Sequence, residues 1–547
     1  MKKESFMEST IIATISLIII KVLGVLYVIP FYAIVGVQGA ALYAYAYNIY
    51  GLFLEISTIG IPNAISKLVN EYNTLNNQEA KIRTFNFGKM ILGFISVISF
   101  IILFIFAPQI GELILGDLTG GNTIEDVSFV IRCVSFALLI FPFLSVTRGF
   151  FQGHRVIHVS SFSQVIEQFV RVFFIIVGSY IALKWLKLDL TYVVGVSVFS
   201  AFIAGVVALL YVTKKLNKNK KDFNLDKKYS EKDNVSSKEI IKKIFIYAVP
   251  AVIVSIAFSI YNNIDMILVL RTMDYLGFDA IEVEFISTAI STWCSKISII
   301  ITTIAMGMMP GLIAAMVEAF TLKNYNEVNN KFNKAMEINI FITLPMCVGI
   351  SLLSSAVWTI FYGYNPLGTN ILAMCIFAPF FSNMFTISNY TLQSINRFKM
   401  VYICAIGGIL VNALLDVPFM LLFDILGIPA YFGATFASIV GFSVTVIVTM
   451  LVLRKSYNFK YGNIIKTIKS CLVPLGTMIA VVLLMKCFLP VNYDSRFSSL
   501  IYLFVIALIG ALSYFIVAKK MGLVNHILGD DFIDKIKDKF IKNKKEV

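Results

Sequence analysis

The sequence contains few of the residues on which enzymes and metal sites depend. It has only three histidines, His154, His158 and His526, and its seven cysteines form no Cys-x-x-Cys pair and no Cys/His cluster. The acidic residues between its apolar segments show no metal-ligand spacing. No phosphate-binding glycine-rich motif is present, so we expect no direct use of ATP. These shortages argue against a zinc protein and an ATPase.

Charged residues are also scarce, whereas apolar residues dominate. Only 14% of the 547 residues are charged, 58% are hydrophobic, and the mean hydropathy is +0.83. Such a composition predicts a polytopic membrane protein. Apolar runs of about 20 residues, the length that crosses a hydrocarbon core, recur along the chain. We predict fourteen transmembrane helices, at 9–35, 41–69, 85–107, 127–150, 160–183, 190–213, 244–270, 286–315, 335–358, 370–394, 399–423, 430–453, 467–488 and 497–518.

The basic residues indicate the orientation. With the N-terminus inside, most of the 46 Lys and Arg fall in inward loops, at inward helix ends and in the C-terminal tail. The positive-inside rule then predicts that both termini are cytoplasmic, which requires an even number of helices. The net charge of +14 follows from this topology, so it is weak evidence for binding of nucleic acid. The first span is too long for the apolar region of a signal peptide.

The loops divide the predicted helices into two groups. Most connections are short, but one long, highly charged stretch separates six helices from eight. We predict an N-terminal lobe at 1–213, a cytoplasmic basic loop at 214–243, a C-terminal lobe at 244–455, helices 13 and 14 at 456–520, and a cytoplasmic basic tail at 521–547. Within the tail, apolar residues recur every four positions among lysines, which predicts either a helix on the inner membrane surface or a solvated basic segment.

A few charged residues lie inside the predicted spans, where each is a candidate for function. Glu167 and Arg171 are four residues apart in the favourable order, so we interpret them as a mutually neutralising pair. Lys21 and Lys296 lie near the middle of their helices and need an anion or an aqueous cavity. The other members of this group are Glu55, Arg132, Asp265 and Asp416.

A further pair of polar residues lies in the apolar run "GGILVNALLDVPFMLL" at 407–422. Asn412 and Asp416 are four residues apart, about one helical turn, and therefore face the same way. A carboxylate there requires a cation, a proton or a polar partner.

Three segments resemble a known family. They are "KVLGVLYVIPFYAIVG" at 21–36, "YNIYGLFLEISTIGIPNAISKLVNEY" at 47–72 and "RGFFQGHRVIHVSSFSQVIEQFVRV" at 148–172. The chain is similar over its whole length to the stage V sporulation protein B/YtgP branch of the MurJ-type lipid II flippases. That branch belongs to the multidrug/oligosaccharidyl-lipid/polysaccharide exporter superfamily.

The resemblance implies a fold and a function. The fold is all-α, with two six-helix lobes in a V shape and two C-terminal helices that form a groove facing lipid. The function is that of a non-enzymatic flippase of the bacterial cytoplasmic membrane, expected as a monomer. It would move an undecaprenyl-diphosphate-linked cell-wall precursor, expected to be lipid II, to the outer leaflet by alternating access, coupled to an ion or to the membrane potential. Its partners would be this substrate and membrane lipids, not nucleic acid.

The resemblance also implies a substrate site. The cavity of MurJ proteins is cationic, and Lys21 stands where the family commonly has arginine in its first helix. We assign Lys296 and Arg148 to the same site, although Lys296 does not align with the family arginine of helix eight. The sequence departs from the pattern at Tyr27 and Gly60, which stand where the better-known branch has arginine. The cationic clamp for the diphosphate is therefore thinner here.

The resemblance further implies a sodium site in some members of the family. The matching positions are Asp265, Asn412, Asp416 and Thr435, with a carbonyl near Tyr431. Carboxylate, amide, hydroxyl and carbonyl oxygens suit a small hard cation. The alternative is a protonated Asp416 that is bonded to a neighbouring helix. Apart from sodium, we expect no cofactor.

Three other functions stay open. A cation-coupled multidrug antiporter of the same superfamily would share the fold, but Lys21 and Lys296 argue against a cavity for cationic drugs. An exporter of another polysaccharide precursor would share the substrate chemistry. A membrane enzyme acting on polyprenyl phosphates would require acidic or histidine clusters at the membrane surface.

Overall fold

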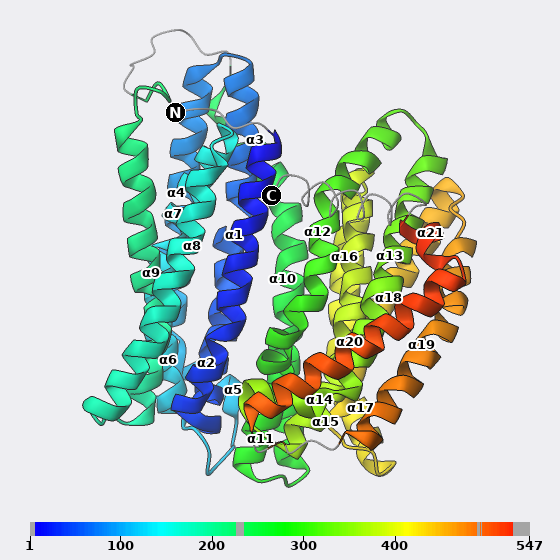
Figure 1. Ribbon diagram of the computed structural model, residues 1–547. Coiled ribbons are helices and arrows are strands. Elements are labelled where there is room, and N and C mark those ends of the chain that lie inside the picture. The colour runs from blue at the N-terminus through cyan, green and yellow to red at the C-terminus, as the bar shows by residue number, and fades with distance from the viewer. Residues whose placement is uncertain (1–5, 59, 226–234, 490–492, 494, 529–547) are drawn as a thin grey trace, which may run out of the picture. The chain divides into compact units, whose positions relative to one another are not determined.

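The computed structural model describes residues 6–58, 60–225, 235–489, 493 and 495–528 (Figure 1). Every regular element in this part of the chain is a helix, so the prediction of an all-α membrane protein is confirmed. The chain divides into two compact units, Met1–Lys296 and Ile297–Val547, and each is described by itself. The V shape and the lobe boundaries stay predictions.

The first unit contains most of the polar side chains considered below. Its elements are α1 (Phe6–Leu26), α2 (Val28–Thr58), α3 (Gly60–Thr74), α4 (Gln78–Ile105), α5 (Ala107–Leu115), α6 (Ile124–Ser135), η1 (Phe136–Leu139), α7 (Phe141–Gly153), α8 (Ile157–Phe173), η2 (Phe174–Gly178), η3 (Ile181–Trp185), α9 (Leu190–Lys218), α10 (Ser237–Tyr275), α11 (Ala280–Thr288) and η4 (Ala289–Trp293).

The second unit is also helical. Its elements are α12 (Cys294–Thr321), whose first three residues belong to the first unit, α13 (Tyr325–Leu352), α14 (Ser354–Tyr362), α15 (Pro366–Cys375), α16 (Ala378–Ser394), α17 (Phe398–Ile425), α18 (Phe432–Tyr457), α19 (Gly462–Phe488), α20 (Arg496–Lys520) and α21 (Leu523–Leu528). The amphipathic pattern predicted for the basic tail lies at 529–547, outside the described residues.

Twelve helical segments within the described residues are long and apolar enough to cross a membrane, so this is a multi-span membrane protein. The predicted number of fourteen is not confirmed. The predicted spans 9–35 and 41–69 fall largely in one of these twelve segments, Ile15–Thr74, within which the backbone leaves the helical conformation at Gly36 (φ 67°, ψ −169°). Glycine tolerates this conformation because it has no Cβ. The predicted span 244–270 lies in α10, which is not among the twelve.

Glycines on α7 bring that helix very close to α3. A Cβ atom at Gly149 would lie 2.6 Å from the carbonyl oxygen of Pro62, and one at Gly153 would lie 2.7 Å from the carbonyl oxygen of Ser66. Only glycine therefore allows the two backbones to approach at both positions. This packing holds the α7 helix, and with it Arg148, against the rest of the first unit.

The segment that follows α9 is attached to α4 at two points. Lys81, which is buried, donates from Nζ to the carbonyl oxygen of Phe223 at 3.0 Å. Arg83 donates to the carbonyl oxygen of Val235 at 3.1 Å and to the hydroxyl of Ser237. The predicted loop at 214–243 is therefore shorter than expected, because α9 continues to Lys218 and α10 begins at Ser237.

In the second unit, α17 and α18 cross at very short range. A Cβ atom at Gly433 would lie 2.3 Å from the backbone nitrogen of Met420, so glycine is needed where the two helices meet. Asn412 and Asp416 of α17 are buried on this side of the helix, and so are Thr435 and Ser438 of α18.

Candidate functional site

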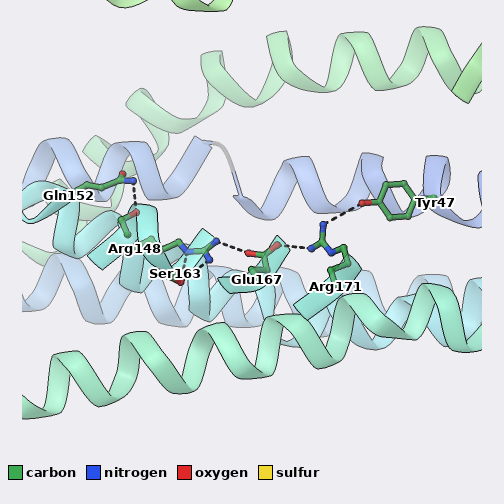
Figure 2. Close-up of polar contacts among 7 residues, drawn as sticks. Tyr47, Arg148, Gln152, Ser163, Glu167 and Arg171 are labelled. Carbon is green, nitrogen blue, oxygen red and sulfur yellow. Dashed lines mark hydrogen bonds and ion pairs between the residues drawn. The ribbon is translucent and has the colours of Figure 1, made fainter. Parts of the chain in front are cut away.

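A buried ion network joins α7 and α8 in the first unit (Figure 2). Arg148 Nη1 lies 2.9 Å from Glu167 Oε2, and Arg171 Nη2 lies 2.6 Å from Glu167 Oε1. The three side chains are only 10–12% exposed. The predicted pair of Glu167 and Arg171 is therefore present, and Arg148 joins it from another helix. Two arginines thus share one carboxylate.

Arg148 is held by more than its ion pair. Its Nε and Nη2 atoms donate to the hydroxyl of Ser163 at 3.1 and 2.8 Å, so the planar guanidinium spans α8 from Ser163 to Glu167. One turn along α7, Gln152 donates to the hydroxyl of Ser160 at 2.8 Å. These contacts fasten α7 to α8 side by side and fix the direction of the guanidinium.

The same residues line a cavity of about 410 Å³ that lies wholly within the first unit. Its charged lining residues are Arg148, Glu167 and Arg171. The polar lining residues include Asn63, Gln152, Gln164 and Gln168. Charge-bearing groups and amides therefore face one cavity in a chain that is otherwise strongly apolar. Such a lining suits an anionic ligand that also carries hydroxyl or amide groups.

The network continues from Arg171 to α2 and to the start of α12. Arg171 Nη1 donates to the hydroxyl of Tyr47 at 3.5 Å. Lys296 Nζ lies 5.3 Å from the centre of the Tyr47 ring and 5.9 Å from that of Tyr27, within the range of a cation–π interaction. Lys296 and Arg171 thus contact the same tyrosine. Tyr27, one of the positions that departs from the family pattern, contributes an aromatic ring to this cluster.

The residues assigned to the substrate site have different surroundings. Arg148 lines the cavity, and Lys296 is connected to it through Tyr47 and Arg171. Lys21 lies on α1 and is half-buried. The α1 helix packs along α8, where Gly24 of α1 faces the side-chain amide of Gln168. None of these observations tests whether the three bind substrate, so that assignment stays a prediction.

Sequence reasoning did not identify Arg171 and the amide side chains as part of the site. The signal was present in "SSFSQVIEQFVR", in which Ser160, Ser163, Gln164, Glu167, Gln168 and Arg171 recur every three or four residues. This spacing places all six on one face of a helix. A polar face on a membrane helix indicates a cavity or a partner.

The residues matched to the sodium site are divided between the two units. In the second unit, Asn412 Nδ2 donates to Asp416 Oδ1 at 3.2 Å and to the hydroxyl of Ser438 at 3.1 Å. The hydroxyl of Thr435 lies 3.0 Å from Cys375 Sγ, and Tyr431 is the buried residue directly before α18. Asp265 is buried in α10 of the first unit. Among the described residues, no three His, Cys, Asp or Glu side chains form a cluster suited to a metal ion.

The donor atoms in the second unit nonetheless fit a small hard cation. One carboxylate, one amide oxygen and two hydroxyls, those of Thr435 and Ser438, come from the neighbouring helices α17 and α18. Oxygen donors of this kind suit sodium better than a transition metal. Ser438 was not predicted from the sequence.

The helical fold and the cationic cavity define a multi-span membrane protein of the transporter type. A family model described as "Polysaccharide biosynthesis protein" matches residues 6–279. The lipid II flippase MurJ of Bacillus subtilis (strain 168) is 31% identical over 532 residues, which are 96% of each chain. The chain therefore belongs to the polysaccharide biosynthesis protein family, as a homologue of MurJ.

Two further comparisons agree with this assignment. Stage V sporulation protein B of the same Bacillus subtilis strain is 26% identical over 212 residues, 39% of each chain. A solved structure of a lipid II flippase MurJ in an inward closed conformation matches with a TM-score of 0.66 and 16% identity. The match covers 95% of this chain and 99% of that one, and it shows the shared fold. The family expected from the sequence is confirmed.

Proposed function

We propose that this protein is a flippase that moves an undecaprenyl-diphosphate-linked cell-wall precursor, lipid II, from the inner to the outer leaflet of the bacterial cytoplasmic membrane. The observation that carries the proposal is the match to the lipid II flippase MurJ along nearly the whole of both chains. The buried cationic cavity of the first unit supports it, because the diphosphate of such a lipid is anionic and its sugars present hydroxyl and amide groups.

Each basic side chain has a separate role in this proposal. Arg148 presents a planar guanidinium at the cavity, which suits a phosphate oxygen. Lys21 and Lys296 provide compact positive charges on α1 and at the start of α12. The three cations would bind the diphosphate during alternating access, while the amide side chains of the cavity contact the sugars.

The charge of the cavity argues against a multidrug antiporter. A cavity for cationic drugs should be lined by acidic or aromatic groups, whereas this cavity has two arginines for one glutamate. We also propose transport without chemical conversion, because the charged groups here are paired in an ion network rather than placed as an acid and a base around a reacting bond.

The proposal includes the topology and the coupling ion. Both termini would be cytoplasmic, and the protein would act as a monomer. The sodium ligands in this proposal are Asp265, Asn412, Asp416, Thr435 and the Tyr431 carbonyl, as matched from the family, together with Ser438, to which Asn412 donates. The ion would supply positive charge that offsets the desolvation of the carboxylates.

The test is rescue of a bacterium depleted of its own lipid II flippase. We expect expression of this protein to restore growth and to prevent accumulation of the lipid-linked precursor. A variant with Glu71→Gln, which lies outside the cavity, serves as the expression control. Failure of the wild type to rescue despite normal membrane levels would reject lipid II as substrate. Protection from cationic drugs in place of rescue would favour the antiporter.

A further inference from the structure

Glu167 occupies a position between two guanidinium groups, each of which binds a different oxygen of its carboxylate. Arg148 binds Oε2 at 2.9 Å and Arg171 binds Oε1 at 2.6 Å. Figure 2 shows the Glu167 carboxylate between the two guanidinium groups. Guanidinium groups directed at separate oxygens of one anion are also a common way in which proteins hold phosphate. Ser163, whose hydroxyl contacts Arg148, keeps this arginine in place.

The charges around Glu167 do not balance. The two arginines exceed the single carboxylate by one positive charge, and Lys296, beside Tyr47, adds a second. A diphosphate that joins a lipid to a sugar carries two negative charges. The cluster in the first unit thus has the excess charge that such a group would neutralise. The adjoining cavity of about 410 Å³ gives an anion a route to the arginines.

We infer that Glu167 is the resident anion of a two-arginine phosphate site, and that the diphosphate of the lipid-linked substrate replaces it between Arg148 and Arg171. The inference rests on the proposed function and names the binding residues within it. Gln152, Gln164 and Gln168, which line the same cavity, then face the sugar adjoining the diphosphate.

Competition between the Glu167 carboxylate and the substrate diphosphate for the two arginines would help the transporter to release its substrate. A site with two arginines and no competing anion would retain the diphosphate, whereas a transporter must also release it. Because Glu167 lies on the same helix as Arg171, its carboxylate can return to the arginines when substrate leaves. Glu167 therefore lowers the affinity for the diphosphate and favours its release.

The test measures binding of two probes, inorganic pyrophosphate and farnesyl diphosphate, to the purified full-length protein by calorimetry. We expect Glu167→Gln to bind farnesyl diphosphate roughly tenfold more tightly than the wild type, since the competing charge is removed while both arginines remain. The wild type should bind farnesyl diphosphate more tightly than pyrophosphate. Equal binding of the two probes would overturn the assignment of the site to a lipid-linked diphosphate.

Glu71→Gln is the matched control. Glu71 also forms an ion pair in the first unit, at 3.1 Å from Lys243, but it does not line the cavity. Burial lowers the pKa of Lys243, but its hydrogen bond to Glu71 and the nearby Tyr72 raise it more, so the pKa of Lys243 is raised overall. Its removal should leave the affinity for both probes unchanged. A comparable rise in affinity in this control would overturn the inference, because any lost carboxylate would then have the same effect.

A second substitution covers the case in which Glu167→Gln does not fold. Glu167→Asp keeps the charge but withdraws it by one methylene, and it should raise the affinity for farnesyl diphosphate by a smaller factor. Unchanged or weaker binding in a folded Glu167 variant would show that Glu167 is only a structural counter-ion. This result would reject the role of Glu167 but not the proposed function. The proposed function fails only if the wild type does not rescue the depleted bacterium.

Discussion

Arg148 provides the sharpest test of how the network is built. In Arg148→Lys the positive charge and the pairing with Glu167 can persist, but the two donors to Ser163, at 3.1 and 2.8 Å, cannot be reproduced by a single ammonium nitrogen. Hydrogen bonds that involve a charged group contribute about 1.5–3 kcal/mol each. Because both bonds share one acceptor, we expect Arg148→Lys to destabilise the protein by about 2 kcal/mol.

Ser163→Ala should have nearly the same effect, because it removes the acceptor of the same two bonds. The double variant should then be little worse than either single variant. Arg148→Ala removes the charge as well. Breaking a buried ion pair costs about 3–5 kcal/mol, and we expect the lower end because Glu167 keeps Arg171 at 2.6 Å.

The assay is thermal unfolding of the purified variants in detergent, with membrane levels as an independent check. Destabilisation should increase from the two conservative variants to Arg148→Ala, and Arg148→Ala should also fail to rescue the depleted bacterium. Additive effects of Arg148→Lys and Ser163→Ala would refute the reasoning, because they would show that the guanidinium and the hydroxyl act independently.

Three further outcomes are expected. Lys21→Ala should abolish rescue at normal membrane levels while Lys21→Arg retains it, and full activity of the alanine variant would remove Lys21 from the substrate site. Sodium, but not choline, should raise the thermal stability of the wild type, and Asp416→Asn and Asp265→Asn should each lose this stabilisation. Sodium-dependent stabilisation that survives in both variants would favour a protonated Asp416. Gly153→Ala should destabilise the protein by about 1–3 kcal/mol, because the added Cβ atom clashes with α3. Gly51→Ala is the control, since a Cβ atom at Gly51 meets open space. Equal thermal stability of the two variants would contradict the close packing of α7 against α3.

The sequence allowed the membrane class to be predicted because hydropathy is summed over many residues and does not depend on any single contact. The pairing of Glu167 with Arg171 was predictable for a different reason, namely that four residues along a helix place two side chains side by side. The number of spans stays unconfirmed, because the predicted boundary between the first two spans, at 36–40, falls inside α2 and no charged loop marks it.

The remaining contacts of the site depend on how helices meet. Arg148 could have been linked to Ser163 by counting from the turn at Arg155, since the two residues lie at similar distances before and after it in an antiparallel helix pair. The approach of Lys296 to Tyr47 had no such signal, because 249 positions separate them. Ser438 was missed because it belongs to the helix that crosses Asn412, and sequence spacing along one helix does not reveal a crossing partner.

The residues on either side of the stretch 224–234 are both attached to α4, so the covalent link between α9 and α10 is not needed to hold its two ends together. Lys81 and Arg83 lie two residues apart and hold Phe223 at one end and Val235 at the other. The ends of the link are thus kept close by side chains, and lengthening it by a factor of two costs only about 0.6 kcal/mol of closure entropy. We expect an epitope, a fluorescent protein or a protease site inserted between them to leave the helices on either side where they are, which makes this stretch the natural place to label the protein.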